Sequence, residues 1–411
     1  MLTRRHWIPP LGLAFGQLCH GLSWVLALWI AMRVGVRTLS LADVAWIHLV
    51  ALGWITVTAF SVLLHAIPSF TDVTWRYETL ARSALFASAP AIAAFVMTLL
   101  WAPQATGIVA TLLAGALLTY LVTAWVTLRQ AVRSTHRVER AVARAFAGTL
   151  AIFAAVVILG VALSWMLSGI RLPTAIALLP PAHADLALFG WLTLLIYGVS
   201  ARTLQPITGN RSSRPRLHVI VGTTTLLGAP TLAIGSAIGT SWVLWLGGGL
   251  IAAGAATYIS DVCVLLMRAT VPHRAPQAFV GAGIVWLAVA VVLGACVLAG
   301  IPCAEAFGFV MLAGWVAQFV NAHVFHIGVR LIATIYRGDD DETRPQHLLD
   351  ARWALCVFAA MQIAVGAITA GLLLHDAGVT AFGAAAGLAG WIAMMGALVK
   401  ARIQAMSWPE M

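Results

Sequence analysis

The sequence predicts an all-α polytopic membrane protein with twelve transmembrane helices in a pseudo-threefold arrangement of three four-helix units. Three observations lead to this prediction: an apolar composition, apolar runs of membrane-spanning length along the whole chain, and a segment that recurs three times. Of the 411 residues, 61% are hydrophobic and only 9% are charged, and the mean hydropathy is +0.95. This composition excludes a soluble globular domain and indicates a chain that lies in a lipid bilayer.

The recurring segment combines histidine with a Gly-Trp pair. It reads WIHLVALGWITVTAFSVLLHAIP at 46–68, AHADLALFGWLTLLIYGVSARTLQP at 182–206 and, more loosely, GWVAQFVNAHVFHIG at 314–328. The spacing from His48 to His183 is 135 residues, and from His183 to His323 it is 140. A period of this size predicts one membrane domain, 1–411, built from three pseudo-repeats at approximately 1–137, 138–274 and 275–411.

A helix crosses the bilayer core with roughly 20 apolar residues, and twelve such runs follow one another along the chain. The histidine segments form the second, sixth and tenth of these runs. The predicted spans are 10–32, 43–67, 79–101 and 105–129 in the first unit, 142–167, 180–204, 215–235 and 240–268 in the second, and 275–299, 304–335, 347–374 and 377–400 in the third.

The basic residues account for the net charge of +10 and predict the orientation of the chain. Lysine and arginine are enriched in the cytoplasmic connections of membrane proteins. With twelve spans, 21 of these residues fall on the side of the two termini, and only Arg33, Arg37 and Arg171 fall on the other side. We therefore expect a bacterial-type inner membrane protein with both termini in the cytoplasm, and no binding of nucleic acid.

The histidines at membrane depth are the candidate functional residues, because an ionisable side chain is costly inside a bilayer. His48 and His183 precede the glycines of their Gly-Trp pairs by five and seven residues. They are therefore expected at nearly the same depth on neighbouring helices. Two imidazoles placed in this way predict the axial ligands of one heme iron. The chain has no C-x-x-C-H motif, so the heme is expected to be of the non-covalent b type.

A second layer of histidines is expected about 18 Å deeper, at the other end of the same spans. His65 and His326 each stand twelve residues after their glycine, where the second segment has Arg202. His323 stands one helical turn before His326. We predict His65, His323 and His326 as metal ligands, and His323 also as a heme ligand.

An intramembrane carboxylate in the eighth span is a candidate for proton transfer. Asp261 lies near the predicted cytoplasmic end of this span, with Tyr258 one turn before it. These two residues suit a proton path. The alternative is that Asp261 reaches water or pairs with Arg268.

These features resemble the heme-copper oxidase superfamily, in particular its catalytic subunit I. That resemblance implies one or two b-type hemes, a copper centre, electron transfer from a partner subunit or cytochrome, and redox chemistry on oxygen or nitric oxide. Subunit I holds its low-spin heme between the second and tenth helices, which would pair His48 with His323. The NnrS family of heme- and copper-associated membrane proteins is a second resemblance. The segments that carry the resemblance are Ile47-His48 with Gly53-Trp54, and Ala182-His183-Ala184-Asp185 with Phe189-Gly190-Trp191.

The copper ligands of the oxidase superfamily do not recur in this chain. Asp185 stands where the H-x-H segment has its second histidine, Ala187 stands where many oxidases have tyrosine, and no two histidines are adjacent. We therefore expect a heme protein of electron transfer or small-gas redox chemistry, an oxidoreductase whose copper site is absent or altered. The alternative is a transporter or sensor whose histidines handle protons or a metal ion.

The charge distribution gives a first testable prediction. Reporter fusions at Met1 and at Met411 should both score as cytoplasmic, because positive connections stay on that side of the membrane. A periplasmic signal at either end would contradict both the span count and the repeat.

The missing copper ligands give a second prediction. The purified chain, loaded with copper and supplied with a reduced artificial donor, should take up oxygen at no more than background rate in an oxygen electrode. Rapid, cyanide-sensitive uptake would show that other residues build a copper site.

Overall fold

A computed structural model of the protein describes residues 8–33, 39–133, 137–170, 179–210, 215–337 and 345–407. Within these ranges, twelve helices are long and apolar enough to cross a membrane, and no β-strand occurs. This confirms the predicted all-α class and the number of spans. Seven of the residues used for the orientation lie outside the described residues: Arg4, Arg5, Arg37, Arg171, Arg211, Arg214 and Arg344.

The first four spans match the predicted ranges to within four residues at each end. The second span is the longest of them and is divided into three segments. The four spans are α1 (Ile8–Arg33), α2–η2–α3 (Leu41–His48, Leu49–Thr56, Val57–Thr71), α4 (Glu78–Trp101) and α5 (Thr106–Val132).

The remaining eight spans repeat this order of one divided helix among three uninterrupted ones. The second group is α6 (Arg137–Leu167), α7–η5–α8 (Pro180–Asp185, Leu186–Thr193, Leu194–Thr208), α9 (Pro215–Ile238) and α10 (Ser241–Met267). The third is α11 (Arg274–Leu298), α12–η6–α13–η7–α14 (Ala304–Phe309, Val310–Val316, Ala317–His323, Val324–Gly328, Val329–Arg337), α15 (Ala351–Leu374) and α16 (Ala377–Ser407).

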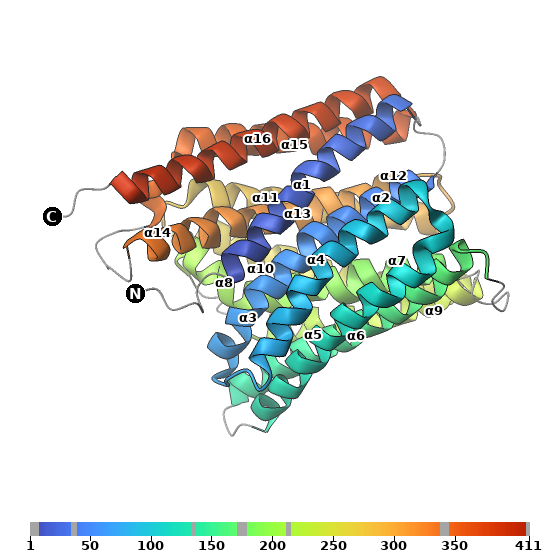
Figure 1. Ribbon diagram of the computed structural model, residues 1–411, viewed down its shortest axis with the longest axis horizontal. Coiled ribbons are helices and arrows are strands. Elements are labelled where there is room, and N and C mark those ends of the chain that lie inside the picture. The colour runs from blue at the N-terminus through green and yellow to red at the C-terminus, as the bar shows by residue number, and fades with distance from the viewer. Residues whose placement is uncertain are drawn as a thin grey trace.

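The helices run along one common axis, and the three divided spans point the same way (Figure 1). α2, α7 and α12 lie at one end of the bundle, and α3, α8 and α14 lie at the other. The divided spans are also the most buried. In their most apolar stretches 67%, 50% and 78% of residues are buried, against 28–44% in the other nine spans of the described chain. The three histidine-bearing spans therefore form the centre, and the other helices face lipid.

Each Gly-Trp pair of the central spans lies within a π-helical segment, a feature that the sequence pattern did not predict. The segments η2, η5 and η6 contain Gly53, Gly190 and Gly314. A side chain of a neighbouring helix packs against each glycine. A Cβ atom at Gly190 would lie 2.4 Å from Ile152 Cγ2, and one at Gly314 would lie 2.9 Å from the Trp286 side chain. π-Helical turns are rare and often mark functional positions.

Indole hydrogen bonds tie the central spans to one another. Trp191 Nε1 donates to Thr56 Oγ1 at 3.1 Å, and Trp315 Nε1 donates to Thr193 Oγ1 at 3.2 Å. Each bond joins a central span to the one before it in the chain. The residue equivalent to these threonines in the tenth span is Ala317, which offers no hydroxyl.

The third tryptophan is held by stacking. Trp54 lies on the ring of His20 from α1, with 3.4 Å between ring centres and 5° between the planes. Repeated π-helical segments and two equivalent Trp–Thr bonds support an internal repeat. The pseudo-threefold arrangement of the three units in space stays a prediction.

Glycines also set the separation of the outer helices. α9 and α10 approach so closely that a Cβ atom at Gly247 would lie 2.4 Å from the backbone nitrogen of Leu232. Small residues allow this approach in membranes, where van der Waals packing largely drives helix association. Gly249 lies two residues further along α10 and is exposed. No atom lies within 4 Å of the position that a Cβ atom would take there.

This contrast gives a matched pair of variants. Gly247→Ala should destabilise the protein by about 1–3 kcal/mol, because the added methyl group forces α9 and α10 apart. Gly249→Ala should be neutral or stabilise by up to about 1 kcal/mol, because alanine favours the helix. Unfolding in mixed detergent micelles measures both. Equal stability of the two variants would contradict the helix spacing described here.

Candidate functional site

His48 is held at the end of α2 with one ring nitrogen bound and the other free. A capping box between Ser40 and Asp43 fixes the start of this helix. One turn before the histidine, the Val44 carbonyl accepts a hydrogen bond of 2.7 Å from Nδ1. The proton therefore resides on Nδ1, and Nε2 keeps its lone pair for a ligand. The described residues place no hydrogen bond on Nε2, and Phe95 meets the ring edge-on at 5.3 Å.

His183 lies in α7, against a glycine of the neighbouring helix α6. A Cβ atom at Gly160 would lie 3.2 Å from His183 Cε1, so a larger residue would move the ring. Nδ1 of His183 is buried and makes no hydrogen bond of ordinary geometry in the described part of the chain, although the Val156 carbonyl lies beside the ring. A buried ring nitrogen in this state is unusual and indicates a site for a ligand or a partner.

The structure brings His48 and His183 together. Their ring centres are 6.3 Å apart, and their planes differ by 22°. Two imidazoles on opposite sides of one metal ion, each at about 2.0–2.1 Å from it, would have ring centres about 6.4 Å apart. The separation of this pair is of that size, and the two rings are stacked with nearly parallel planes.

His323 does not join this pair. Its Nδ1 donates to the Phe319 carbonyl at 2.7 Å, and its Nε2 accepts from Thr203 Oγ1 at 2.7 Å. Both ring nitrogens are thus engaged within the protein. Among the described ring contacts, His48 meets Phe95 and His183 and does not meet His323.

The deeper histidines are arranged differently from the predicted layer. His65 is exposed, and its Nε2 lies 3.3 Å from Ser69 Oγ on the same helix. The ring of His326 meets His273 edge-on, with 5.5 Å between ring centres. Across the described residues, no three His, Cys, Asp or Glu side chains are grouped to hold a metal ion. The metal site of His65, His323 and His326 stays a prediction, without a matching cluster.

His273 was not predicted as part of any site. It lies directly before α11, in the connection between two spans, and only 9% of its surface is exposed. A histidine in a connection carries no sequence signal of burial, because neither depth nor helical period applies to it.

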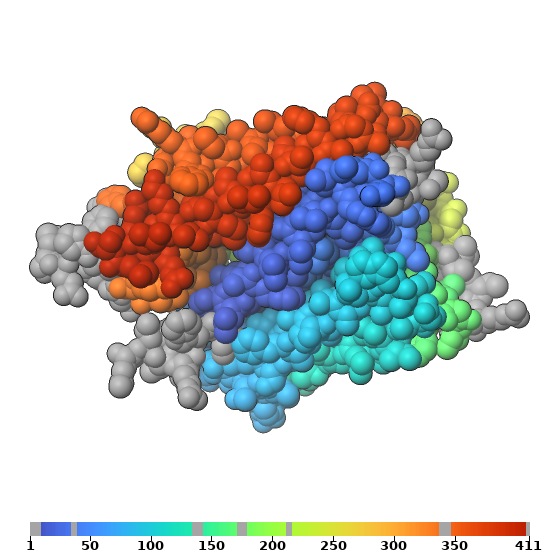
Figure 2. Space-filling view, turned by 45° about the horizontal axis from the view of Figure 1, so that its top comes forward, coloured from blue at the N-terminus to red at the C-terminus, as the bar shows by residue number. Residues whose placement is uncertain are grey.

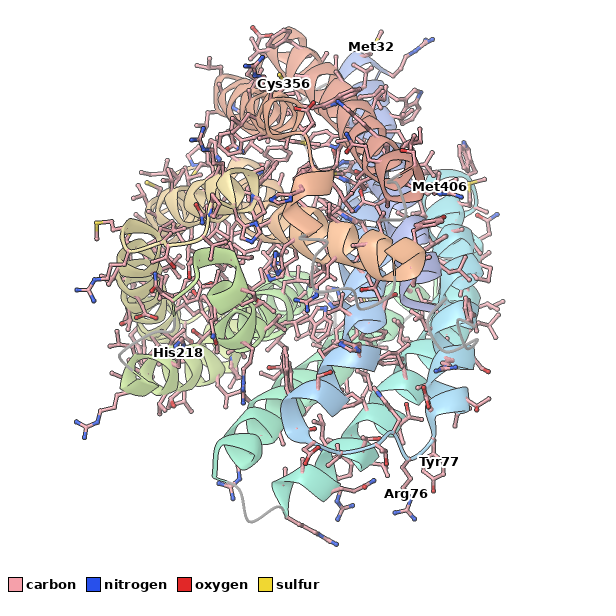
Figure 3. All side chains as sticks on the ribbon, turned by 90° about the vertical axis from the view of Figure 1, so that its left-hand side faces the viewer. Met32, Arg76, Tyr77, His218, Cys356 and Met406 are labelled. Carbon is pink, nitrogen blue, oxygen red and sulfur yellow. The ribbon has the colours of Figure 1, made fainter. Side chains whose placement is uncertain are left out.

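Asp261 pairs with a histidine of the neighbouring helix. Its Oδ2 lies 3.7 Å from Nε2 of His218, which is labelled at the rim of the bundle in Figure 3. One turn earlier, the ring of Tyr258 packs on Tyr197 at 4.4 Å and on Trp315 at 5.7 Å. The predicted proton path therefore has a half-exposed histidine at one end and a buried aromatic cluster at the other.

Asp185, which stands where the oxidases have histidine, binds a neighbouring helix. Its Oδ2 accepts a hydrogen bond of 2.6 Å from Ser236 Oγ on α9. This carboxylate therefore ties α7 to α9, and His183 is left as the single imidazole of its segment.

Comparison with models of known protein families gives no match to this chain, and comparison with curated protein sequences gives none either. The resemblance to heme-copper oxidases and to the NnrS family therefore stays an expectation from the residues themselves.

Proposed function

We propose that this chain is a heme-binding integral membrane protein of electron transfer, with His48 and His183 as the axial ligands of one b-type heme. The observation that carries the proposal is the 6.3 Å separation of their nearly parallel rings. Each histidine comes from a different central span, so the two ligands also hold the second and sixth spans in register.

The surroundings of the two rings support this assignment. The Val44 carbonyl fixes the ring of His48 and increases its basicity, as second partners of metal-binding histidines do. Gly160 gives the ring of His183 space that a larger residue would take, because a Cβ atom there would lie 3.2 Å from Cε1. A heme held by two imidazoles supplies reversible one-electron exchange at its iron.

The ligand count favours electron transfer over gas reduction. If both His48 and His183 held the heme, their two imidazoles would leave no position at the iron for oxygen or nitric oxide. A second heme or a copper ion at His323 would have to displace Thr203 from Nε2. We therefore include one heme and no copper in the proposal.

The location of the pair fits a redox partner on one side of the membrane. His48 and His183 lie toward the end of the bundle that carries α2 and α7 (Figure 1). In the predicted inner-membrane orientation this end is periplasmic, where a partner subunit or a soluble cytochrome could exchange electrons.

A transporter or sensor is the second candidate, and the pair of His273 with His326 favours it. Their edge-on rings, 5.5 Å apart, suit two ligands of one cation. Burial lowers the pKa of His273, so its imidazole stays neutral and can bind a metal ion at pH 7. A colourless purified protein that binds Zn²⁺ or Cu²⁺ through these residues would favour this candidate.

Single substitutions test the heme assignment. His48→Ala and His183→Ala should each lower heme affinity by more than about 100-fold, because even the second partners of metal ligands contribute about 10–100-fold. The wild-type protein should contain one heme per chain with a low-spin spectrum. Pyridine-hemochrome assay and absorption spectra measure both quantities.

His323→Ala and His20→Phe are the controls, and both should keep a low-spin heme. If His183→Ala keeps the low-spin heme while His323→Ala loses it, the ligands are His48 and His323. A wild-type protein without heme would contradict the proposed function itself.

A further inference from the structure

The Gly-Trp pairs of the three central spans form a layer, and a cavity lies on the side of this layer away from His48 and His183. This cavity suggests a second site. It has a volume of about 520 Å³, within the range of small-molecule sites. Its walls come from α1, α3, α8, α13, α14 and α16, and Figure 2 shows α1 and α16 side by side on the surface. The lining is almost wholly apolar, and none of the described lining residues carries a formal charge.

Two polar side chains in this lining lack partners. Gln17 Nε2 and Thr58 Oγ1 are buried and make no hydrogen bond within the described structure. The two residues are only 6% and 8% exposed. A buried polar group without a partner is costly, and it is costlier where lipid rather than water surrounds the protein.

A chain of hydrogen bonds fixes which atom of Gln17 is the unpaired one. Trp24 Nε1 can only donate, so His20 Nε2 accepts its hydrogen bond at 3.0 Å. The proton of the neutral imidazole is then on Nδ1, which donates to Gln17 Oε1 at 3.4 Å. Trp391 Nε1 donates to the backbone carbonyl oxygen of Gln17 at 2.8 Å and so anchors the residue. The unpaired atom of the Gln17 side chain is therefore the donor Nε2, while Oε1 already accepts from His20.

We propose that the cavity binds a neutral, membrane-soluble molecule whose carbonyl oxygen accepts a hydrogen bond from Gln17, with Thr58 as its second polar contact. Apart from Gln17, Thr58 and His323 the lining is apolar, so most of the cavity suits the apolar body of a lipid-soluble molecule rather than water. The lining has no Lys, Arg, Asp or Glu side chain to bind an ion, and its one imidazole, His323, has both ring nitrogens engaged. Either a quinone ring or the ester of a neutral lipid supplies this chemistry. The proposal does not depend on heme binding.

Binding to purified protein in detergent tests the proposal and separates the two sources. The probes are a decyl-substituted benzoquinone and didecanoylglycerol, and decylbenzene is the control that has the apolar body without a carbonyl. At least one carbonyl probe should raise the thermal midpoint and remain bound in native mass spectrometry, with decylbenzene at least about tenfold weaker. The probe that binds identifies the source. Failure of both carbonyl probes, or equal binding of decylbenzene, would overturn the proposal.

Isosteric variants assign the contact to the two side chains. Gln17→Met and Thr58→Val should each weaken the binding probe by about tenfold, while the ligand-free protein stays as stable as wild type or becomes more stable. A purely structural role would instead lower the stability of the ligand-free protein. Thr257→Val is the control, because Thr257 on α10 does not line the cavity and donates to the Ala253 carbonyl of its own helix. Binding unchanged in both Gln17→Met and Thr58→Val would contradict the proposal.

Discussion

Within the bilayer every buried polar group must find its partner inside the protein, and this constraint explains most of the interior of this chain. The indoles of Trp191 and Trp315 meet threonines of the preceding central span. His323 has a partner for each ring nitrogen. Against this background the exceptions are informative. Ten buried side-chain atoms of the described residues make no hydrogen bond of ordinary geometry, and three of them, His183 Nδ1, Gln17 Nε2 and Thr58 Oγ1, belong to the two proposed binding sites.

Close packing at the glycines of the Gly-Trp pairs also holds the three central spans against their neighbours. The Gly-Trp pairs let a neighbouring side chain reach the backbone of each central span, as Ile152 does at Gly190 and Trp286 does at Gly314. The π-helical segments lie over these contacts. A π-helical turn changes the rotation of the residues that follow, so the direction of a histidine differs from that on a regular α-helix.

The parts that could be predicted are those that depend on local sequence. Length and hydropathy fix a span, and the positions of His48 and His183 relative to their glycines predicted their equal depth. The π-helical segments depend on packing between helices, which the local pattern does not encode. Neither the bond between His323 and Thr203 nor the contact of His326 with His273 could be foreseen, because each joins segments far apart in sequence.

The Gly-Trp layer also divides the interior into two compartments. Along the second and sixth spans, His48 and His183 precede their tryptophans, whereas Thr58 and Leu195, which line the cavity, follow them. α1 runs the other way, and its Cys19 lies at Gly53, so Gln17 falls on the cavity side. The three central spans thus carry a pair of histidines on one side of a tryptophan layer and an apolar cavity on the other. The two Trp–Thr bonds join the central spans at the layer between these two sides.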